Sequence, residues 1–290
     1  LGAADVEARL AAIEVLQPTL FAFQVALAAL WESFGIVPDV VVGHSLGEVS
    51  AAHVAGVLGL ADAARVICRR SRLLASIRGR GAMAVVELSL AEAGEAIGAR
   101  ADRLSVAASN SPRSTVLAGD SAALEQLLAE LEGRAVFARR VKVDVASHSP
   151  QVDPLRERLL GALAGIAPGR ARIRLVSTVT GQPLDGPEMG PSYWVDNLRR
   201  PVLFWPAADR LAGEGVAAFV ESSPHPILLP ALEEGLGGRA AVVPSLRRGE
   251  PERAAVLRAL GALHALGRRI DPRGVFPAGG RVVSTPRPPW

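Results

Sequence analysis

The segment with residue types best suited to chemistry is G-H-S-L-G at 43–47, a G-x-S-x-G pattern directly after the apolar run Val40–Val42. Between a strand and a helix, this pattern places a nucleophilic serine on a sharp turn. Gly43 and Gly47 have no side chains to crowd such a turn, so we expect the Ser45 hydroxyl to project past the carboxyl end of the sheet. The N–H groups that begin the following helix would stabilise negative charge there. The pattern therefore predicts nucleophilic catalysis by Ser45.

A serine nucleophile needs a base, and His148 is the best candidate among the five histidines. It follows a predicted strand that ends at Val145, and the next two residues, Ser149 and Pro150, are typical of a helix start. Ligands bind at the carboxyl ends of strands in α/β sheets, so Ser45 and His148 are expected to meet in one crevice. Taken alone, Ser-His-Ser-Pro is more typical of a capping or turn histidine.

The other four histidines are expected to be structural. His44 would pack at the turn, His53 on the next helix, His225 in a rigid turn between prolines and His264 on a late helix. A serine esterase of the usual order has its histidine late in the chain. Under that alternative, His225 or His264 would be the base.

Arg70 is expected to be buried. The predicted helix 60–77 has an apolar face formed by Ala63, Val66, Ile67, Leu74 and Ile77. Arg70 falls on that face, whereas Arg65, Arg69, Arg72 and Ser76 form the solvated side. A buried guanidinium needs an anionic partner, either an internal carboxylate or a substrate carboxylate held by two hydrogen bonds.

Composition excludes few functions. The single cysteine, Cys68, cannot form an internal disulfide, so we expect a reducing compartment, the cytoplasm. No Cys/His spacing suits a metal, so we expect a site without a metal. We expect no membrane span, because no uninterrupted apolar run has membrane length. A net charge of +3 is weak evidence for nucleic acid binding and would suit an acidic protein partner.

The order of predicted elements indicates an α/β fold. Helices are expected at 5–34, with an interruption at Pro18, and at 46–57 and 60–77, on either side of the strand Val40–Val42. Strands at 84–88, 105–108, 115–118 and 136–145 with helices at 91–97 and 122–132 form a β-α-β-β-α-β, ferredoxin-like unit. The α/β layer then resumes with a helix at 150–163, a strand at 173–177, a helix at 200–211 and a strand at 217–221.

Five segments, in order and with matching spacing, resemble the acyltransferase domains of modular type I polyketide synthases, which are similar to malonyl-CoA:acyl carrier protein transacylase. They are G-H-S-L-G-E at 43–48, C-R-R-S-R at 68–72, A-S-H-S-P at 146–150, Y-W-V-D-N-L-R-R-P-V at 193–202 and E-S-S-P-H-P at 221–226. The resemblance covers nearly the whole chain. It implies an α/β-hydrolase-like core, 1–82 and 146–270, with an inserted ferredoxin-like subdomain, 83–145, and a linker at 271–290.

The resemblance also implies a reaction and its residues. Ser45 would take the acyl group of an extender-unit CoA and pass it to the phosphopantetheine thiol of an acyl carrier protein, with His148 as base and acid. Arg70 would bind the extender's carboxylate, and the Leu46 N–H would be an oxyanion donor. A backbone carbonyl near the position of Asn197 would orient the base. A ketosynthase domain would be a neighbour, and no cofactor would stay bound.

In this family, the residues that lead up to the catalytic histidine vary with the extender. Here they are Val145, Ala146 and Ser147. A small serine at 147 implies methylmalonyl-CoA, whereas Val145 and the Leu46 that follows the nucleophile depart from the usual methylmalonyl pattern. Methylmalonyl-CoA is therefore favoured, with malonyl-CoA as the alternative.

One part of the family pattern has no match. Its Gly-Gln-Gly-type segment, with the first strand and a second oxyanion donor, does not precede Leu1. Loss of such a donor would lower kcat by about 10²–10³-fold, and loss of the strand would expose a sheet edge. A non-catalytic docking module is therefore a further alternative.

Overall fold

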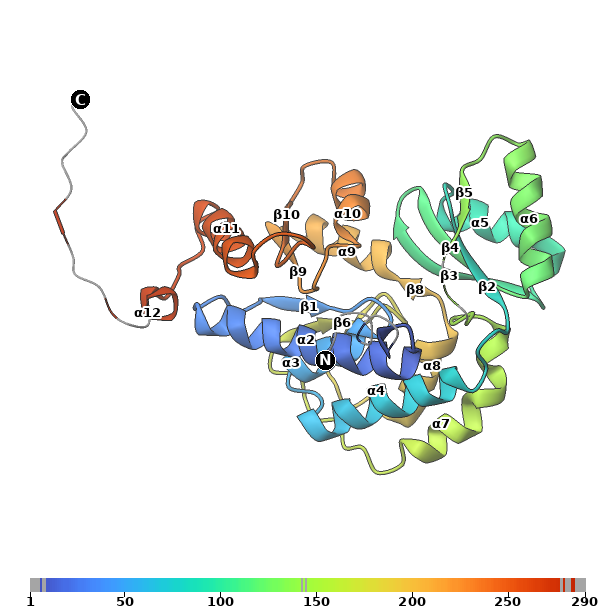
Figure 1. The fold of residues 1–290 in the computed structure, drawn as a ribbon, viewed down its shortest axis with the longest axis horizontal. Helices are drawn as coiled ribbons and strands as arrows, with labels where there is room; N and C mark the ends of the chain where they lie inside the picture. The colour runs from blue at the N-terminus through green and yellow to red at the C-terminus, as the bar shows by residue number, and fades with distance from the viewer. Residues whose placement is uncertain are drawn as a thin grey trace.

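The computed structural model describes residues 6, 9–141, 143, 145–276, 279 and 283–284. Figure 1 shows two parts. The larger contains short strands with helices packed around them, and the smaller, at the upper right, is a sheet with two helices. The fold is thus an α/β core with a small subdomain, as expected.

The small part has the β-α-β-β-α-β order that the sequence predicts. Its elements are β2 (Ala82–Val86), α5 (Leu90–Ile97), the 3-10 turn η1 (Gly98–Arg100), β3 (Leu104–Ser111), β4 (Ser114–Gly119), α6 (Ser121–Gly133) and β5 (Ala138–Arg140). The strands lie in the order β5-β2-β4-β3 and each pair among them is antiparallel. Ser89 and Asp120 cap the two helices with side-chain hydrogen bonds, which defines where each helix begins.

The core begins with helices that surround one short parallel pair. Its first elements are α2 (Ile13–Ser33), β1 (Val40–Val42), α3 (Gly47–Val54), α4 (Leu60–Ala75), the 3-10 helix η2 (Pro150–Leu155), α7 (Arg156–Ala162), β6 (Arg174–Val176) and β7 (Pro183–Leu184). β1 pairs with β6 in parallel register, Val41 opposite Leu175. The rest are α8 (Pro191–Arg199), β8 (Val202–Leu203), α9 (Phe204–Gly213), β9 (Ala218–Glu221), α10 (Leu229–Leu236), β10 (Ala241–Pro244), α11 (Glu252–Ala265) and α12 (Pro272–Val275).

Three expected elements differ from those observed. The predicted helix 200–211 begins only at Phe204, because Arg200 precedes a proline and is extended, with ψ 159°. The predicted strand 136–145 is reduced to β5 and a single bridge at Val145; Lys142 and Asp144, also in it, lie outside the described residues. The break expected at Pro18 lies instead at Ala12, and α2 runs through the proline.

α2 is long and apolar enough to cross a bilayer by length and composition alone, which the sequence analysis did not expect. In the structure its Phe21, Leu27 and Trp31 are buried in hydrophobic clusters with other elements. Only 17% of its apolar window is buried inside the structure, however, so most of this helix lies outside the core.

β8 joins the two parts. It pairs in parallel with β3, with Val202 opposite Ala108 and Leu203 opposite Ser109. The subdomain sheet therefore continues into the segment that directly follows α8. The position of the subdomain relative to α8 is consequently held by backbone pairing as well as by side-chain contacts.

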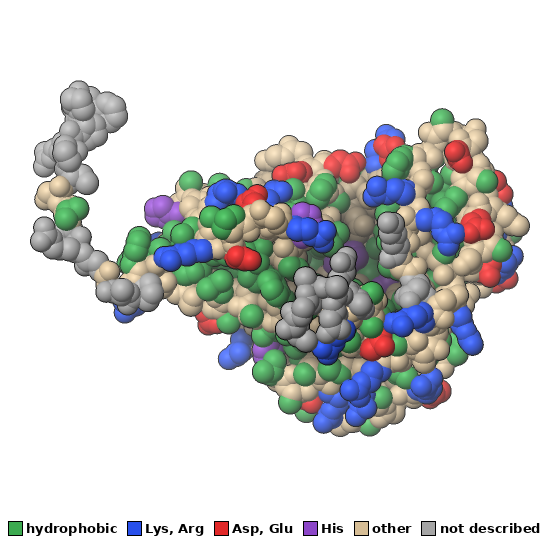
Figure 2. Space-filling model, in the orientation of Figure 1, with side chains coloured by type: hydrophobic (Ala, Val, Ile, Leu, Met, Phe, Trp, Pro, Cys, Tyr) green, Lys and Arg blue, Asp and Glu red, His purple; other side chains and the backbone are tan. Residues whose placement is uncertain are grey.

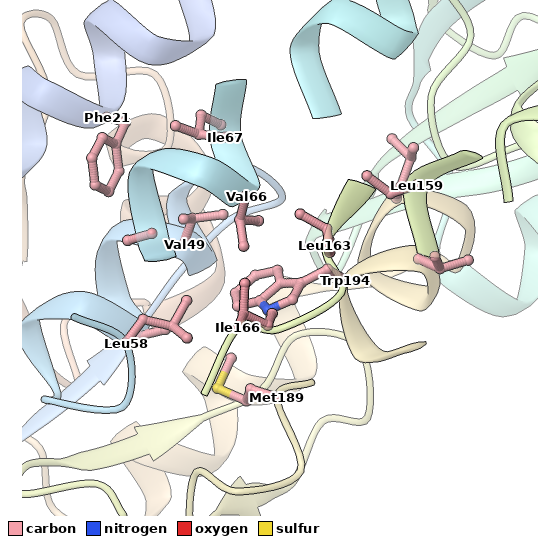
Figure 3. Close-up of a cluster of buried hydrophobic side chains, with 14 of the residues drawn as sticks. Phe21, Val49, Leu58, Val66, Ile67, Leu159, Leu163, Ile166, Met189 and Trp194 are labelled. Carbon is pink, nitrogen blue, oxygen red and sulfur yellow. The ribbon is translucent and has the colours of Figure 1, made fainter. Parts of the chain in front are cut away.

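A large cluster of buried hydrophobic side chains lies between the helices of the core (Figure 3). Val49 of α3, Val66 and Ile67 of α4 and Trp194 of α8 are all at most 1% exposed. Burial stabilises the folded state by roughly 1.5–3 kcal/mol for each large side chain, so this cluster holds α3, α4 and α8 together. These are the helices expected to hold Ser45, Arg70 and Asn197 in place.

The turn after β1 brings two stretches of backbone into close contact. Ser45 has φ 53°, the left-handed region that side chains other than glycine rarely adopt. A Cβ on Gly43 would lie 2.2 Å from the Cα of Glu48, whereas a Cβ on Gly47 would meet nothing closer than the Gln24 side chain at 3.7 Å. The expectation that glycine keeps the turn free is therefore confirmed for Gly43 and wrong for Gly47.

We predict that Gly43→Ala lowers the free energy of unfolding by about 1–3 kcal/mol, because the new methyl group collides with backbone that cannot move aside alone. Gly47→Ala, the matched control, should leave that free energy unchanged or raise it, since alanine favours helix. Urea unfolding followed by circular dichroism measures both. Equal stability of Gly43→Ala and the parent chain would contradict the geometry.

Candidate active site

The structure brings Ser45 and His148 together. Ser45 Oγ lies 2.8 Å from His148 Nε2, and His148 Nδ1 lies 2.9 Å from the backbone oxygen of Arg200. A carbonyl oxygen only accepts, so Nδ1 carries the ring proton and Nε2 is free to accept the Ser45 hydroxyl proton. This is the arrangement of a nucleophile with a positioned base, in which a carbonyl takes the place of the usual carboxylate.

Both members of the pair lie on turns with unusual backbone. His148 has φ 60°, and its N–H donates to the Leu198 oxygen at 2.9 Å. With Ser45 at φ 53°, each residue costs of order 1–3 kcal/mol relative to relaxed backbone, and such strain clusters at active sites. The capping interpretation of His148 does not describe its side chain, because Ser149 is the residue that caps η2.

Burial keeps the base uncharged. His148 is 3% exposed. Burial lowers its pKa to about 3, and the positive charge of Arg70 adds to this fall. A histidine with such a pKa is neutral at pH 7 and can accept a proton from Ser45.

Arg70 is buried, as its position on the apolar face predicts, and it is 1% exposed. Its Nη2 donates to Ser45 Oγ at 3.0 Å, while its Nε and Nη1 have no hydrogen-bond partner among the described residues. No carboxylate within that part of the chain forms an ion pair with it, so the internal salt bridge is wrong. Burial lowers the pKa of Arg70 to about 10, so the group remains charged at pH 7 beside the nucleophile.

The start of α3 supplies a free N–H. The N–H groups of Gly47 and Glu48 donate to the oxygens of His44 and Ser45. The Leu46 N–H, by contrast, makes no hydrogen bond with any residue that the structure describes. It follows Ser45 directly, the position of an oxyanion donor in a G-x-S-x-G turn.

Asn197 reaches the nucleophile rather than the base. Its Nδ2 donates to the Ser45 backbone oxygen at 3.3 Å and to Glu48 Oε2 at 2.7 Å. The carbonyl at His148 belongs to Arg200, three positions later along the chain. Sequence reasoning did not assign a role to Glu48 or Arg200, although both lie in the segments that carry the resemblance.

The residues before His148 differ in their surroundings. Val145 is 3% exposed and belongs to the same hydrophobic cluster as the buried side chains of α4. Ala146 is fully buried in the cluster that includes residues of the subdomain sheet and of α9. Ser147 alone is half-buried. Of the three, it has the most space for a change in size.

The side chains of the other four histidines make no hydrogen bond to Ser45 in the part of the chain that the structure describes. His44 Nε2 pairs with Asn110 Oδ1 at 2.8 Å and its ring packs on Phe204. His53, His225 and His264 pair with backbone groups of Leu58, Arg248 and Arg268. The late base that an esterase of the usual order requires is therefore not at the nucleophile. Among the described residues, no three His, Cys, Asp or Glu side chains lie together in a metal-binding group.

Figure 2 shows a hollow between the core and the subdomain, with histidine side chains in it. Ser45 and His148 come from the core on either side of the insertion, and Asn110 comes from β3 of the subdomain. The site thus lies where the two parts meet.

The chain matches the family model for the acyl transferase domain over residues 3–270. It is 48% identical over 285 residues to erythronolide synthase EryA3 of Saccharopolyspora erythraea, covering 96% of this chain and 9% of that protein. It is also 48% identical to the spectinabilin polyketide synthase system protein NorA' of Streptomyces orinoci, covering 89% of this chain and 7% of that protein. The chain therefore spans under a tenth of the length of these two relatives.

Solved structures give the same result. The acyltransferase domain from module 8 of the salinomycin polyketide synthase superposes with a TM-score of 0.89 at 41% identity, over 91% of this chain and 63% of that one. A loading acyltransferase from the avermectin modular polyketide synthase superposes with a TM-score of 0.82 at 41% identity, over 88% of this chain and 81% of that one. The chain belongs to the acyl transferase family and is an acyltransferase domain of the kind found in modular polyketide synthases.

Proposed function

We propose that this domain transfers an extender unit from CoA to an acyl carrier protein through an acyl-Ser45 intermediate. One observation carries the proposal: the Ser45 hydroxyl lies between a neutral base, His148, and the buried, charged guanidinium of Arg70. The base activates the nucleophile, and two nitrogens of the guanidinium, Nε and Nη1, are left for a substrate.

Each half of the reaction is a transfer at a carbonyl. Ser45 Oγ attacks the thioester carbon while its proton moves to His148 Nε2; the C–S bond then breaks, and the CoA sulfur takes that proton. The carrier's phosphopantetheine thiol next gives its proton to His148 and attacks the Ser45 ester; the ester C–O bond then breaks, and Ser45 Oγ takes that proton from His148. The Leu46 N–H would stabilise the oxyanion in both halves.

Arg70 would select substrates that carry a carboxylate. Its unpartnered Nε and Nη1 are available as donors of charge-assisted hydrogen bonds to a carboxylate. An acyl group without that carboxylate leaves the buried donors unpaired, which costs about 1–3 kcal/mol or more. Malonyl and methylmalonyl groups satisfy this requirement, and acetyl groups do not.

We propose methylmalonyl-CoA as the preferred extender and malonyl-CoA as the alternative. The small, half-buried Ser147 beside the base supports a site with space for an α-methyl group. Leu46 and Val145, the two departures from the usual methylmalonyl pattern, support malonyl-CoA. A single methyl group changes specificity by only about 1–3 kcal/mol.

The expected partners follow from the reaction. They are the extender CoA as substrate, an acyl carrier protein and a neighbouring ketosynthase in a longer polypeptide, with no cofactor held permanently and no nucleic acid or membrane. The 9% coverage of the erythronolide synthase supports such a multidomain setting. The cytoplasm remains the proposed location.

Intact-protein mass spectrometry tests the acyl-enzyme. After mixing with malonyl-CoA or methylmalonyl-CoA, we expect the mass of one acyl group to appear on the chain, and no adduct with acetyl-CoA or in Ser45→Ala. Arg70→Ala should acylate at least about tenfold more slowly, since charge-assisted hydrogen bonds are lost. Arg69→Ala, on the exposed side of α4, is the matched control and should acylate normally.

Absence of any adduct on a folded sample would contradict the proposed transfer and favour the docking module. Adducts of equal amount from acetyl-CoA and the carboxylated CoAs would leave the nucleophile in place but remove the proposed role of Arg70.

The pH dependence of acylation follows from the base. A base with its pKa lowered to about 3 stays unprotonated as the pH falls through 6.5, the ordinary histidine value. We therefore expect kcat/KM for acylation to stay nearly constant from pH 7.5 to 5.5, where a base of pKa 6.5 would have lost about 90% of its active form. Rapid-quench acylation measures this, with circular dichroism at each pH as the control for folding. A tenfold fall centred near pH 6.5 would contradict the account.

Ser147→Phe tests the extender choice. Phenylalanine next to the base fills the space for an α-methyl group, so we expect the preference to shift toward malonyl-CoA by about 10- to 200-fold. Competition between the two CoAs, read from the ratio of the two adduct masses, measures the preference. An unchanged ratio would show that the pocket for the methyl group does not include position 147.

A further inference from the structure

Glu48, the last residue of the G-H-S-L-G-E segment, has no role in the proposed reaction although it is fully buried. Tyr193 Oη donates to its Oε1 at 2.5 Å, the Thr178 N–H to the same oxygen at 3.1 Å, and Asn197 Nδ2 to its Oε2 at 2.7 Å. Burial raises the pKa of Glu48, and these hydrogen bonds act against the rise. Burying an acidic group costs free energy even when it is paired. The negative charge of Glu48 also raises the pKa of the buried Arg70 guanidinium.

Two of the three residues that donate to Glu48 lie on one helix. Tyr193 and Asn197 are both on α8, four residues apart and thus on the same face. Glu48 is in the first turn of α3, directly after the nucleophile turn. One carboxyl group thereby ties α8 to α3 at two points.

α8 and the residue after it hold both members of the catalytic pair. Asn197 donates to the Ser45 oxygen, and the oxygens of Leu198 and Arg200 accept from the N–H and the Nδ1–H of His148. Any rotation or slide of α8 relative to α3 would move His148 relative to Ser45. The 2.8 Å distance between Ser45 Oγ and His148 Nε2 therefore depends on how these two helices are joined.

We propose that Glu48 is a positioning residue that clamps α8 onto α3 and so sets the distance and angle between Ser45 and His148. This inference rests on the proposed roles of Ser45 and His148. It adds that Glu48, without contact to the substrate, is required for the serine to be activated.

Glu48→Gln tests the clamp with little change of shape. Asn197 Nδ2 donates to one carboxyl oxygen of Glu48, and the Thr178 N–H donates to the other. Whichever way the new amide points, its NH2 group therefore faces one of these donors. Tyr193→Phe is the milder variant, because it removes one hydrogen bond and leaves Asn197 on Glu48. Glu221→Gln is the matched control: Glu221 accepts from the N–H groups of Ile227, Leu228 and Leu229, and among the described residues it makes no hydrogen bond to α8 or to the catalytic pair.

The readout is the rate of Ser45 phosphonylation by a small fluorophosphonate, alongside acylation by methylmalonyl-CoA. In the probe reaction the serine oxygen displaces fluoride from phosphorus and its proton goes to His148, so neither an extender nor a contact between Arg70 and a substrate carboxylate is needed. We expect Glu48→Gln to slow phosphonylation and the maximal rate of acylation by about 10- to 100-fold, with the half-saturating CoA concentration unchanged. Tyr193→Phe should show a smaller loss, and Glu221→Gln no loss of rate even where its melting temperature falls.

A folded Glu48→Gln that reacts with the probe at the parent rate would overturn the proposal. If Glu48→Gln does not fold, a Tyr193→Phe that reacts at the parent rate overturns it. So does a Glu221→Gln that loses as much rate as the α8 variants, because the effect would then follow stability. A different result would contradict the proposed function alone. If the parent chain reacts with the probe but with none of the acyl-CoAs, it retains an activated Ser45 but is not the proposed transferase.

Discussion

A positive charge buried beside the nucleophile, with no anion in contact among the described residues, is the constraint on which the rest of the site depends. The Arg70 guanidinium is 1% exposed and donates one hydrogen bond to Ser45. Its charge helps to lower the pKa of His148, which keeps the base neutral. Its Nε and Nη1 are the donors that the proposed substrate carboxylate would engage. In the proposed reaction Arg70 thus contributes to substrate choice and, together with burial, to the low pKa of the base.

The fold supplies this arrangement by joining distant segments. Ser45 and His148 lie on turns before and after the inserted subdomain, and α8, later still, contacts both. The cluster around Trp194 fixes α3, α4 and α8 against each other, and β8 attaches the subdomain sheet to the end of α8. Packing therefore holds the helices close, and the buried polar contacts of Glu48 and Asn197 set their register.

Local patterns in the sequence are sufficient to predict much of this arrangement. The apolar run before G-x-S-x-G and the periodicity of α4 placed the nucleophile turn and the burial of Arg70 correctly, because burial follows helix period. The subdomain order was also correct. What local patterns do not contain is pairing across the chain: the Arg200 carbonyl at His148 and the contacts of Glu48 join residues more than 50 positions apart. The positive φ of Ser45 and His148 was likewise not visible, since neither residue is glycine.

The most direct measurement of the central claim compares acylation of Ser45 by methylmalonyl-CoA and by propionyl-CoA, whose acyl groups differ only in the carboxylate. The account predicts a second-order rate constant at least about tenfold higher for methylmalonyl-CoA, the difference expected from charge-assisted hydrogen bonds to Arg70, and loss of that difference in Arg70→Ala. Equal rate constants for the two CoAs in the parent chain would contradict it.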